Sequence, residues 1–256
     1  MSKIAICADI HGREFWKIIK EHKDDFDKIV FLGDYLAPYP HEDITNKKAI
    51  EVFEEVIDFK KENPDKVILL FGNHDGSYLT KDICECRTDH RNWNLINNIF
   101  TENIKLFDLA WEITVNDKRY FFSHAGVRKE WFDIYVKDKW FAWNSETLPP
   151  AGYFNYAFHT AYDNDDNLEK KIKIFLGLKV YSRYRGWTFD NNGSIIWADI
   201  REFFSGEKSE YDDVYFVVGH TQLQNKPIID ENIACLDVRR PFVFDTETEK
   251  IEEYEK

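Results

Sequence analysis

Five short apolar runs in this sequence each end in side chains that can bind a metal ion. The runs are 3–8, 28–32, 67–71, 120–123 and 214–218, and the candidate ligands that follow them are Asp9, His11, Asp34, Asn73, His124 and His220. A polar residue is common at the end of a strand, so a single one carries little information. Five such strand ends in one chain indicate a shared metal centre.

The types of these side chains indicate which ions they bind. Carboxylate and imidazole ligands together favour manganese, iron, zinc or a similar ion, whereas calcium sites use oxygen ligands alone. The six ligands are more than one ion with an open position needs, and two ions that share a bridging carboxylate would use them all. Gly33, Gly72 and Gly219 come directly before three of the ligands. We expect these glycines to let the backbone turn sharply there.

Hydrophobic periodicity predicts the elements that position these ligands. The runs 3–8, 28–32 and 67–71 are typical of buried strands, and apolar residues at helical spacing predict helices over 13–22 and 44–61. A further helix is expected over 89–100, which is rich in asparagine and not strongly amphipathic. Alternating strands and helices indicate an α/β fold. In such folds the carboxyl ends of the strands line a ligand crevice, so the ligands would converge on one place.

The second half of the chain has a looser pattern. Residues 111–115 and 119–123, on either side of Asn116 and Asp117, predict a β-hairpin. A strand is predicted over 214–218, and 232–236, 242–245 and 250–254 predict a closing meander. Residues 128–190 are rich in aromatic side chains and irregular, apart from a helix expected over 168–176. We therefore expect a single domain over 1–256, with an insertion at about 128–190.

Composition excludes several functional classes. The chain has 256 residues, 43% of them hydrophobic, and a formal net charge of −13 at pH 7. This charge argues against broad binding to nucleic acid or to an anionic membrane. No apolar run approaches the roughly 20 residues that span a bilayer, and no signal-peptide pattern comes before the first strand. The four cysteines are too few and too scattered for a disulfide framework, so we expect a reducing, cytoplasmic setting.

In their order, the motifs resemble those of the calcineurin-like metallophosphoesterases. The matching segments are Asp9-Ile10-His11-Gly12, Gly33-Asp34-Tyr35, Gly72-Asn73-His74-Asp75, Ser123-His124-Ala125-Gly126 and Gly219-His220-Thr221. Within that superfamily they are most similar to the phosphoprotein phosphatases, including bacterial and phage members. The tyrosine after Asp34 and the Gly-His-Thr motif without a second histidine are typical of that branch.

The resemblance implies an α/β fold in which two sheets form a β-sandwich flanked by helices, with a dinuclear metal centre at one sheet end. By motif position, Asp9 and His11 bind the first ion and Asp34 bridges the two. Asn73, His124 and His220 complete the second site. We expect two divalent ions, manganese first, with iron, zinc or nickel as alternatives. Gln222 stands where many related phosphodiesterases have a further histidine ligand.

Two positions depart from the phosphoprotein phosphatase pattern. Ala37 stands where an acid would orient the catalytic histidine, His74, and Pro38 stands where an arginine would bind phosphate. Asp75, Asp43 or a later acid is a candidate replacement for the missing acid.

Three arginines are candidate replacements for the missing phosphate ligand. Arg201 comes first, because the segment from Trp197 to Arg201 resembles a shorter Trp-x-Arg segment of the bacterial enzymes. Arg183 and Arg185 are the alternatives, and Asn73 is a further candidate for contact with the substrate. A guanidinium suits this role because it binds phosphate through two parallel hydrogen bonds.

The resemblance implies metal-assisted hydrolysis of a phosphoester. A bridging hydroxide would attack phosphorus, with Asp34 holding the metal pair, Arg201 binding the phosphoryl group and His74 protonating the leaving oxygen. The expected substrate is a phosphomonoester, either phosphoserine or phosphothreonine in a protein or a small phosphoester. A phosphodiesterase or nucleotide-polyphosphate hydrolase of the same superfamily is the alternative. A third hypothesis, of another class, is a non-catalytic interaction module.

Overall fold

The structure is a computed structural model that describes residues 2–79, 87–140, 142–163, 174–185, 191–204, 211 and 213–255. The chain divides into two units, which are described separately. Unit 1 contains Met1–Phe107, Gln222–Pro227 and Leu236–Lys256, and unit 2 contains Asp108–Thr221 and Ile228–Cys235. Within the described ranges, no helix combines the length and the apolar character needed to cross a membrane.

Unit 1 is built on a six-stranded mixed sheet with the strand order β11-β10-β1-β2-β3-β4. Its strands are β1 (Lys3–Cys7), β2 (Lys28–Phe31), β3 (Val67–Leu70), β4 (Phe107–Asp108), β10 (Phe242–Asp245) and β11 (Lys250–Glu253). Strands β1, β2 and β3 run parallel, whereas β10 is antiparallel to both β1 and β11. The strands predicted over 3–8, 28–32 and 67–71 are confirmed.

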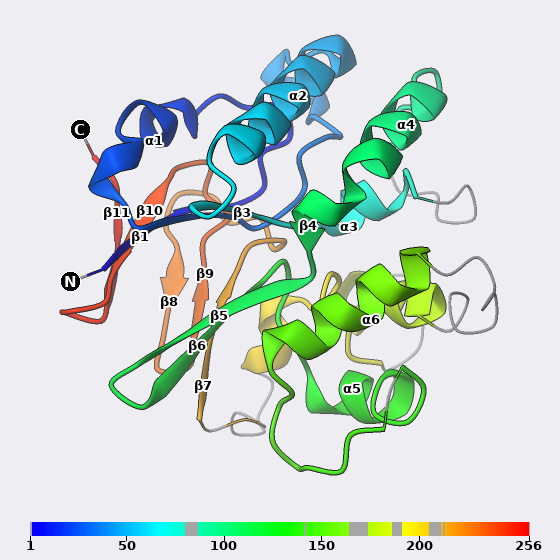
Figure 1. Ribbon diagram of the computed structural model, residues 1–256, viewed down its shortest axis with the longest axis vertical. Coiled ribbons are helices and arrows are strands. Elements are labelled where there is room, and N and C mark those ends of the chain that lie inside the picture. Colours follow the sequence, from blue (N-terminus) through cyan, green and yellow to red (C-terminus); the bar gives the residue numbers. More distant parts are fainter. Residues whose placement is uncertain are drawn as a thin grey trace. The chain divides into compact units, whose positions relative to one another are not determined.

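The helices of unit 1 are α1 (Lys17–Glu21), α2 (Asn46–Glu62), α3 (Asn73–Gly76) and α4 (Trp93–Asn103), with 3-10 turns at Lys23–Asp25, Pro40–Glu42 and Ile104–Leu106. Helices α1, α2 and α4 lie on one face of the six-stranded sheet (Figure 1). The core beneath them contains a cluster of aromatic rings. The ring of Phe53, on α2, lies 4.7 Å from that of Phe100, on α4, and 5.3 Å from that of Tyr35.

Helix α2 follows its prediction closely, and α1 does not. The side chain of Thr45 accepts the N–H of Lys48 at 3.1 Å, which caps α2 and begins it at Asn46 rather than at 44. Helix α1 is shorter than the predicted 13–22. At the start of the predicted range, Arg13 instead closes a turn, in which its backbone N–H donates to the carbonyl of Ile10 at 2.8 Å.

Unit 2 is built on a five-stranded mixed sheet with the order β5-β6-β7-β9-β8. Its strands are β5 (Ala110–Val115), β6 (Lys118–Ser123), β7 (Val214–Val218), β8 (Ile228–Ile229) and β9 (Ile233–Cys235). The predicted hairpin is confirmed as β5 and β6. The two turn residues, Asn116 and Asp117, have φ of 47° and 64°, as tight hairpins require. Strand β7 runs parallel to both β6 and β9.

The closing meander is a wrong prediction. All three strands of the predicted meander are present, but of these three only β10 and β11 pair with each other. Strand β9 joins the other sheet beside β7, with Ile233 opposite Phe216. All three residues of β9 are buried. A short apolar run contains no information about its pairing partner, so proximity in the sequence was a poor guide to the sheet that β9 joins.

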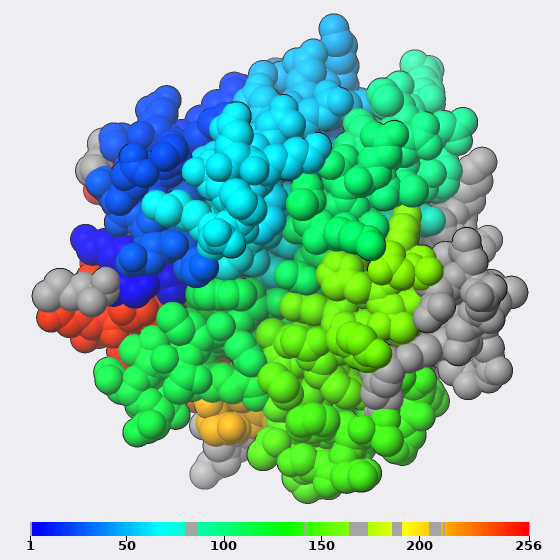
Figure 2. Space-filling view, viewed as in Figure 1, coloured from blue at the N-terminus to red at the C-terminus, as the bar shows by residue number. Residues whose placement is uncertain are grey.

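The insertion contains more regular structure than its sequence indicated. Helices α5 (Lys129–Tyr135) and α6 (Ala151–Asp163) lie in it, along with the 3-10 turn Arg183–Arg185. Helix α6 packs on β5, buries Phe154 and Phe158, and leaves its outer face on the surface (Figure 2). The spacing of these two aromatic residues could have identified the helix. Most of the helix expected over 168–176 lies outside the described residues.

Close packing of two strand-end loops in unit 1 generates a prediction for stability. Gly33 has a φ of +100°, and a Cβ placed on it would lie 2.6 Å from the backbone nitrogen of Gly72. We expect Gly33→Ala to lower the free energy of unfolding by about 2–4 kcal/mol, from backbone strain and overpacking. Urea denaturation of the metal-free protein measures this loss. Gly152→Ala is the control, because a Cβ there meets nothing within 4 Å. Equal midpoints for the two variants would contradict the prediction.

Candidate metal centre

The first group of ligands lies in unit 1, in the loops that follow β1 and β2. Ligand atoms of Asp9, His11 and Asp34 lie within 4.8 Å of one another, and all three side chains are buried. Backbone hydrogen bonds join the two loops. The N–H of His11 donates to the carbonyl of Asp34 at 2.8 Å, and that of Gly12 donates to the carbonyl of Tyr35 at 2.9 Å. The prediction that neighbouring strand ends bring these ligands together is confirmed for this group.

The backbone of these three ligands is in the left-handed region. The φ angles of Asp9, His11 and Asp34 are 50°, 45° and 56°. Left-handed backbone costs a residue other than glycine about 1–3 kcal/mol, although aspartate and histidine tolerate it better than most. Because all three candidate ligands carry this cost, we infer that the loops adopt this backbone conformation in order to bring the three side chains together. Gly33 is also left-handed, but Gly72 is extended, with φ −100° and ψ 174°. Gly72 is needed for space, because a Cβ there would collide with Asp34.

The imidazole of His11 is held in the form that binds metal ions. Its Nδ1 lies 2.6 Å from the carbonyl oxygen of Leu36, to which it donates, so Nε2 carries the lone pair. This Nε2 lies 3.6 Å from Oδ2 of Asp34. Burial lowers the pKa of His11 well below its usual value, and the opposing charge of Asp34 does not reverse this effect. His11 is therefore neutral at pH 7.

A second loop, which contains α3, is fixed to Asp34 by the buried carboxylate of Asp75. Oδ2 of Asp75 accepts the N–H groups of Asp34 and Gly72, each at 2.9 Å, and Oδ1 accepts the N–H of Tyr35 at 3.1 Å. In return, the N–H of His74 donates to Oδ1 of Asp34 at 2.9 Å. Asp34 is thus held through both its backbone and its carboxylate. The role of Asp75 in this loop was not predicted.

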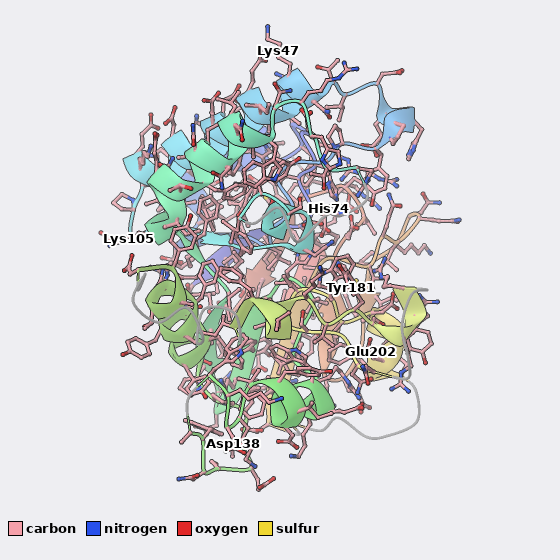
Figure 3. The ribbon with its side chains drawn as sticks, turned by 90° about the vertical axis from the view of Figure 1, so that its right-hand side faces the viewer. Lys47, His74, Lys105, Asp138, Tyr181 and Glu202 are labelled. Atoms are coloured by element: carbon pink, nitrogen blue, oxygen red, sulfur yellow. The ribbon has the colours of Figure 1, made fainter. Side chains whose placement is uncertain are left out.

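Helix α3 begins with the predicted ligand Asn73 and the predicted catalytic residue His74, both buried. Figure 3 labels His74. Arg87, which sequence reasoning missed, contacts the imidazole of His74. Its Nη2 lies 2.8 Å from Nε2 of His74. Because arginine only donates hydrogen bonds, Nε2 carries the lone pair of His74 in this arrangement. Arg87 lies 13 residues beyond His74, outside every motif, so no sequence signal identified it.

The two acids named as replacement partners for His74 have other surroundings. The described hydrogen bonds of the Asp75 carboxylate go to backbone amides of the two loops. Asp43 is exposed, in a turn with φ 54°. Ala37 is buried and left-handed, with φ 61°, at the position where related enzymes have the acid.

The remaining predicted ligands lie in unit 2, after β6 and β7. Nε2 of His124 lies 3.2 Å from Nδ1 of His220, and both side chains are buried. The N–H of Gly219 donates to the carbonyl of His124 at 2.9 Å, which joins the two strand ends. His220 is left-handed, with φ 62°, and its ring packs against Trp197 at 5.4 Å. The prediction that these two histidines lie together is confirmed.

The three candidate phosphate-binding arginines differ in their surroundings. Nε and Nη2 of Arg201 bind the two carboxylate oxygens of Asp199 at 2.7 and 3.0 Å. Arg185 also pairs with Asp199, at 3.1 Å, and its Nη2 lies 3.2 Å from the carbonyl oxygen of His220. Arg183 instead donates to Oδ1 of Asn192 at 2.6 Å. Of the three, Arg185 is the one with a described contact to a candidate ligand.

Asp199 is the residue that organises this arginine pair. Its side chain is 1% exposed. Burial acts to raise the pKa of Asp199, but the hydrogen bonds from Arg201 and the charge of Arg185 outweigh it, so the pKa lies below its usual value. Asp199 is therefore a carboxylate at pH 7, and it holds both guanidinium groups beside the loop of His220.

The ligands in each unit fit a divalent transition-metal ion. In unit 1 two carboxylates surround a neutral imidazole whose other nitrogen donates to a carbonyl, as metal-binding histidines usually do. In unit 2 the two imidazoles place nitrogen atoms 3.2 Å apart. These donor types suit manganese, iron or zinc.

Comparison with known proteins gives this geometry a family context. The family model described as calcineurin-like phosphoesterase matches residues 2–222. The fold is similar to that of a cold-active protein-tyrosine phosphatase from a psychrophilic Shewanella species, with a TM-score of 0.62 and 16% identity over 100% of this chain and 81% of that one. A protein serine/threonine phosphatase from Saccharomyces cerevisiae matches with a TM-score of 0.53 and 15% identity, over 100% of this chain and 80% of that one. At these identities the likeness shows the fold alone.

The hydrogen bonds of Asp75 generate the second prediction. In Asp75→Asn one carboxylate oxygen is replaced by an NH2 group, which faces a backbone N–H and cannot accept its hydrogen bond. The negative charge of the carboxylate is also lost. Because hydrogen bonds to a charged group contribute about 1.5–3 kcal/mol each, we expect a loss of about 2–4 kcal/mol in the free energy of unfolding. We also expect weaker manganese binding, because Asp34 loses its support. Urea denaturation and a metal titration measure the two effects.

The control for Asp75→Asn is Glu54→Gln, which removes one negative charge from an exposed position of α2. This variant should match the wild type in stability and metal affinity. If Asp75→Asn had the same stability as Glu54→Gln, the loop contacts would not have the importance assigned to them.

Proposed function

The chain belongs to the calcineurin-like phosphoesterase family and is a phosphoester hydrolase, and on this premise we propose that it is a metal-dependent phosphomonoesterase of the phosphoprotein phosphatase type. One observation carries the proposal. The buried group of Asp9, His11 and Asp34 presents two carboxylates and an imidazole whose lone pair is held on Nε2. Such a set is costly to bury unless it binds a cation.

We propose that the six predicted ligands hold two divalent ions, manganese first. Asp9 and His11 would bind one ion, Asp34 would bridge, and Asn73, His124 and His220 would hold the second. Support comes from the chemistry of each group of ligands and from the order of the family motifs. Bound divalent ions polarise the phosphoryl group and activate water as a nucleophile.

The side chains around the ligands have separate proposed roles. His74 would take up a proton at Nε2, the nitrogen that Arg87 contacts in this structure, and give it to the leaving oxygen. Arg201 and Arg185 bind the phosphoryl group, and Asp199 holds both of them in place. Arg183 is the weaker candidate, because its guanidinium donates to Asn192.

A test of the metal assignment is the variant Asp34→Asn. An amide does not bridge two cations as a carboxylate does, so we expect turnover of an aryl phosphomonoester at saturating manganese to fall by at least about 10³-fold, close to the loss of a full catalytic group. Steady-state kinetics and metal analysis measure the effect. The control is Asp58→Asn, an exposed aspartate on α2, which should keep full activity. Near-wild-type turnover in Asp34→Asn would show that the dinuclear assignment is wrong.

The substrate class is tested by comparing an aryl phosphomonoester with a bis-aryl phosphodiester, both under saturating manganese. We expect kcat/KM to favour the monoester by at least about 10-fold, which corresponds to about 1.4 kcal/mol. The phosphodiesterase hypothesis predicts the reverse order, because Pro38 replaces a phosphate-binding arginine of the related phosphatases. Activity on phosphoserine and phosphothreonine peptides then tests the protein-phosphatase assignment.

A further inference from the structure

Arg87 lies in a cluster of unit 1 side chains beside the candidate metal ligands. Its guanidinium carbon stacks 3.6 Å from the centre of the Tyr39 ring, and its Nη2 lies 2.8 Å from Nε2 of His74. The ring of His11 lies 5.1 Å from Tyr39 and 5.4 Å from His74. We call these four residues, Arg87, Tyr39, His74 and His11, the Arg87 cluster. In this cluster the cation of Arg87 contacts the predicted catalytic histidine directly. It is connected to the predicted metal ligand His11 through Tyr39 and His74.

The backbone and the stacking both hold Arg87 toward His74. Arg87 has a φ of +71°, which arginine rarely adopts, so its side chain leaves the chain in a direction that an ordinary conformation would not give. The contact with the Tyr39 ring then holds the guanidinium through a cation–π interaction. Tyr39 comes directly after Pro38, so the cation lies next to the position where the related phosphatases carry an arginine.

A second arginine near the same tyrosine shows what is unusual about Arg87. The guanidinium carbon of Arg13 lies 5.3 Å from the Tyr39 ring, and this arginine binds both carboxylate oxygens of Glu42, at 2.8 and 3.0 Å. Across the described part of the chain, Arg87 has no carboxylate within ion-pair distance, and its Nη1 is buried without a hydrogen-bond partner. Arg13 therefore has a carboxylate partner in Glu42, which Arg239 shares, whereas no carboxylate in the described ranges pairs with Arg87.

We propose that Arg87 binds the terminal oxygens of a phosphomonoester dianion beside His74, in place of the arginine that is missing at Pro38. This inference rests on the proposed function and deepens it, because it names the substrate class. An arginine presents two N–H groups side by side, which match two phosphoryl oxygens. A neutral imidazole is a weaker acceptor than a phosphate dianion, so the substrate takes Nη2 from His74. The freed Nε2 then takes up a proton from solvent and gives it to the leaving oxygen.

The same contact explains selectivity between ester classes. A monoester offers three terminal oxygens and two negative charges, whereas a diester offers two terminal oxygens and one charge. A paired hydrogen bond to a guanidinium therefore contributes more to binding the monoester. The arginine missing from the motif was the reason to consider a phosphodiesterase. Arg87 supplies such a cation from another position of unit 1.

The test uses the full chain loaded with manganese and the variants Arg87→Gln and Arg87→Lys. The first measurement is binding of inorganic phosphate by titration calorimetry. The second is the steady-state kinetics of an aryl phosphomonoester and a bis-aryl phosphodiester. We expect Arg87→Gln to weaken phosphate binding by about 10- to 100-fold, from the loss of a charge-assisted pair. Its kcat/KM should fall at least as far for the monoester and by less than about 5-fold for the diester.

Two matched variants separate binding from a structural effect. Arg91→Gln removes the same charge from an exposed position four residues away and should leave both measurements unchanged. Arg87→Lys restores the charge without the paired geometry, so its phosphate affinity should lie between those of Arg87→Gln and the wild type. Metal content and melting temperature should match the wild type in all three variants.

The outcomes distinguish this proposal from the proposed function. If Arg87→Gln binds phosphate as tightly as the wild type, or loses monoester and diester activity in equal proportion, the role of Arg87 is overturned. If the wild type hydrolyses no monoester and yet binds phosphate in an Arg87-dependent way, the proposed function fails and the Arg87 site stands.

Discussion

The carboxylate of Asp75 joins the two loops on which the unit 1 ligands depend. It accepts three backbone N–H groups, from Asp34, Tyr35 and Gly72, in a fully buried position. Without such an acceptor these donors would be buried and unsatisfied, which costs about 1–3 kcal/mol each. The carboxylate thus holds Asp34 in a left-handed conformation that its own backbone disfavours. It also places α3, and with it His74, beside the ligand group.

Further hydrogen bonds hold the unit 1 candidate ligands in place. The loops after β1 and β2 bond to each other through His11 and Gly12, and the Nδ1–H of His11 is committed to the carbonyl of Leu36. The cost of left-handed backbone is therefore met by hydrogen bonds within the fold. A ligand set held in this way loses little conformational freedom on binding a cation, which favours tight and geometrically selective coordination.

Charge is distributed around the site in a way that the net value of −13 does not reveal. In unit 2 the buried carboxylate of Asp199 pairs with Arg185 and Arg201, and in unit 1 Glu42 pairs with Arg13. Each of these two carboxylates is shared by two arginines, since Arg239 also pairs with Glu42, so neither carboxylate balances all of the positive charge beside it. Asp9 and Asp34 are the carboxylates whose charge the proposed ions would balance. The overall negative charge is therefore compatible with an anionic substrate, because local cations set the field that a phosphoryl group meets.

The sequence by itself determined the strands that end in candidate ligands, the hairpin around Asn116 and Asp117, and the choice of side chains proposed to bind metal. These follow from local patterns, because burial imposes a period on apolar residues and a metal requires particular donor atoms. Only the tertiary structure decided that β9 leaves the closing strands for the other sheet and that Asp75 binds backbone amides. It alone placed Arg87 against His74. The physical reason is that a strand, a carboxylate or a guanidinium group pairs with whatever the fold brings close to it in space. A local sequence pattern contains no information about that distance.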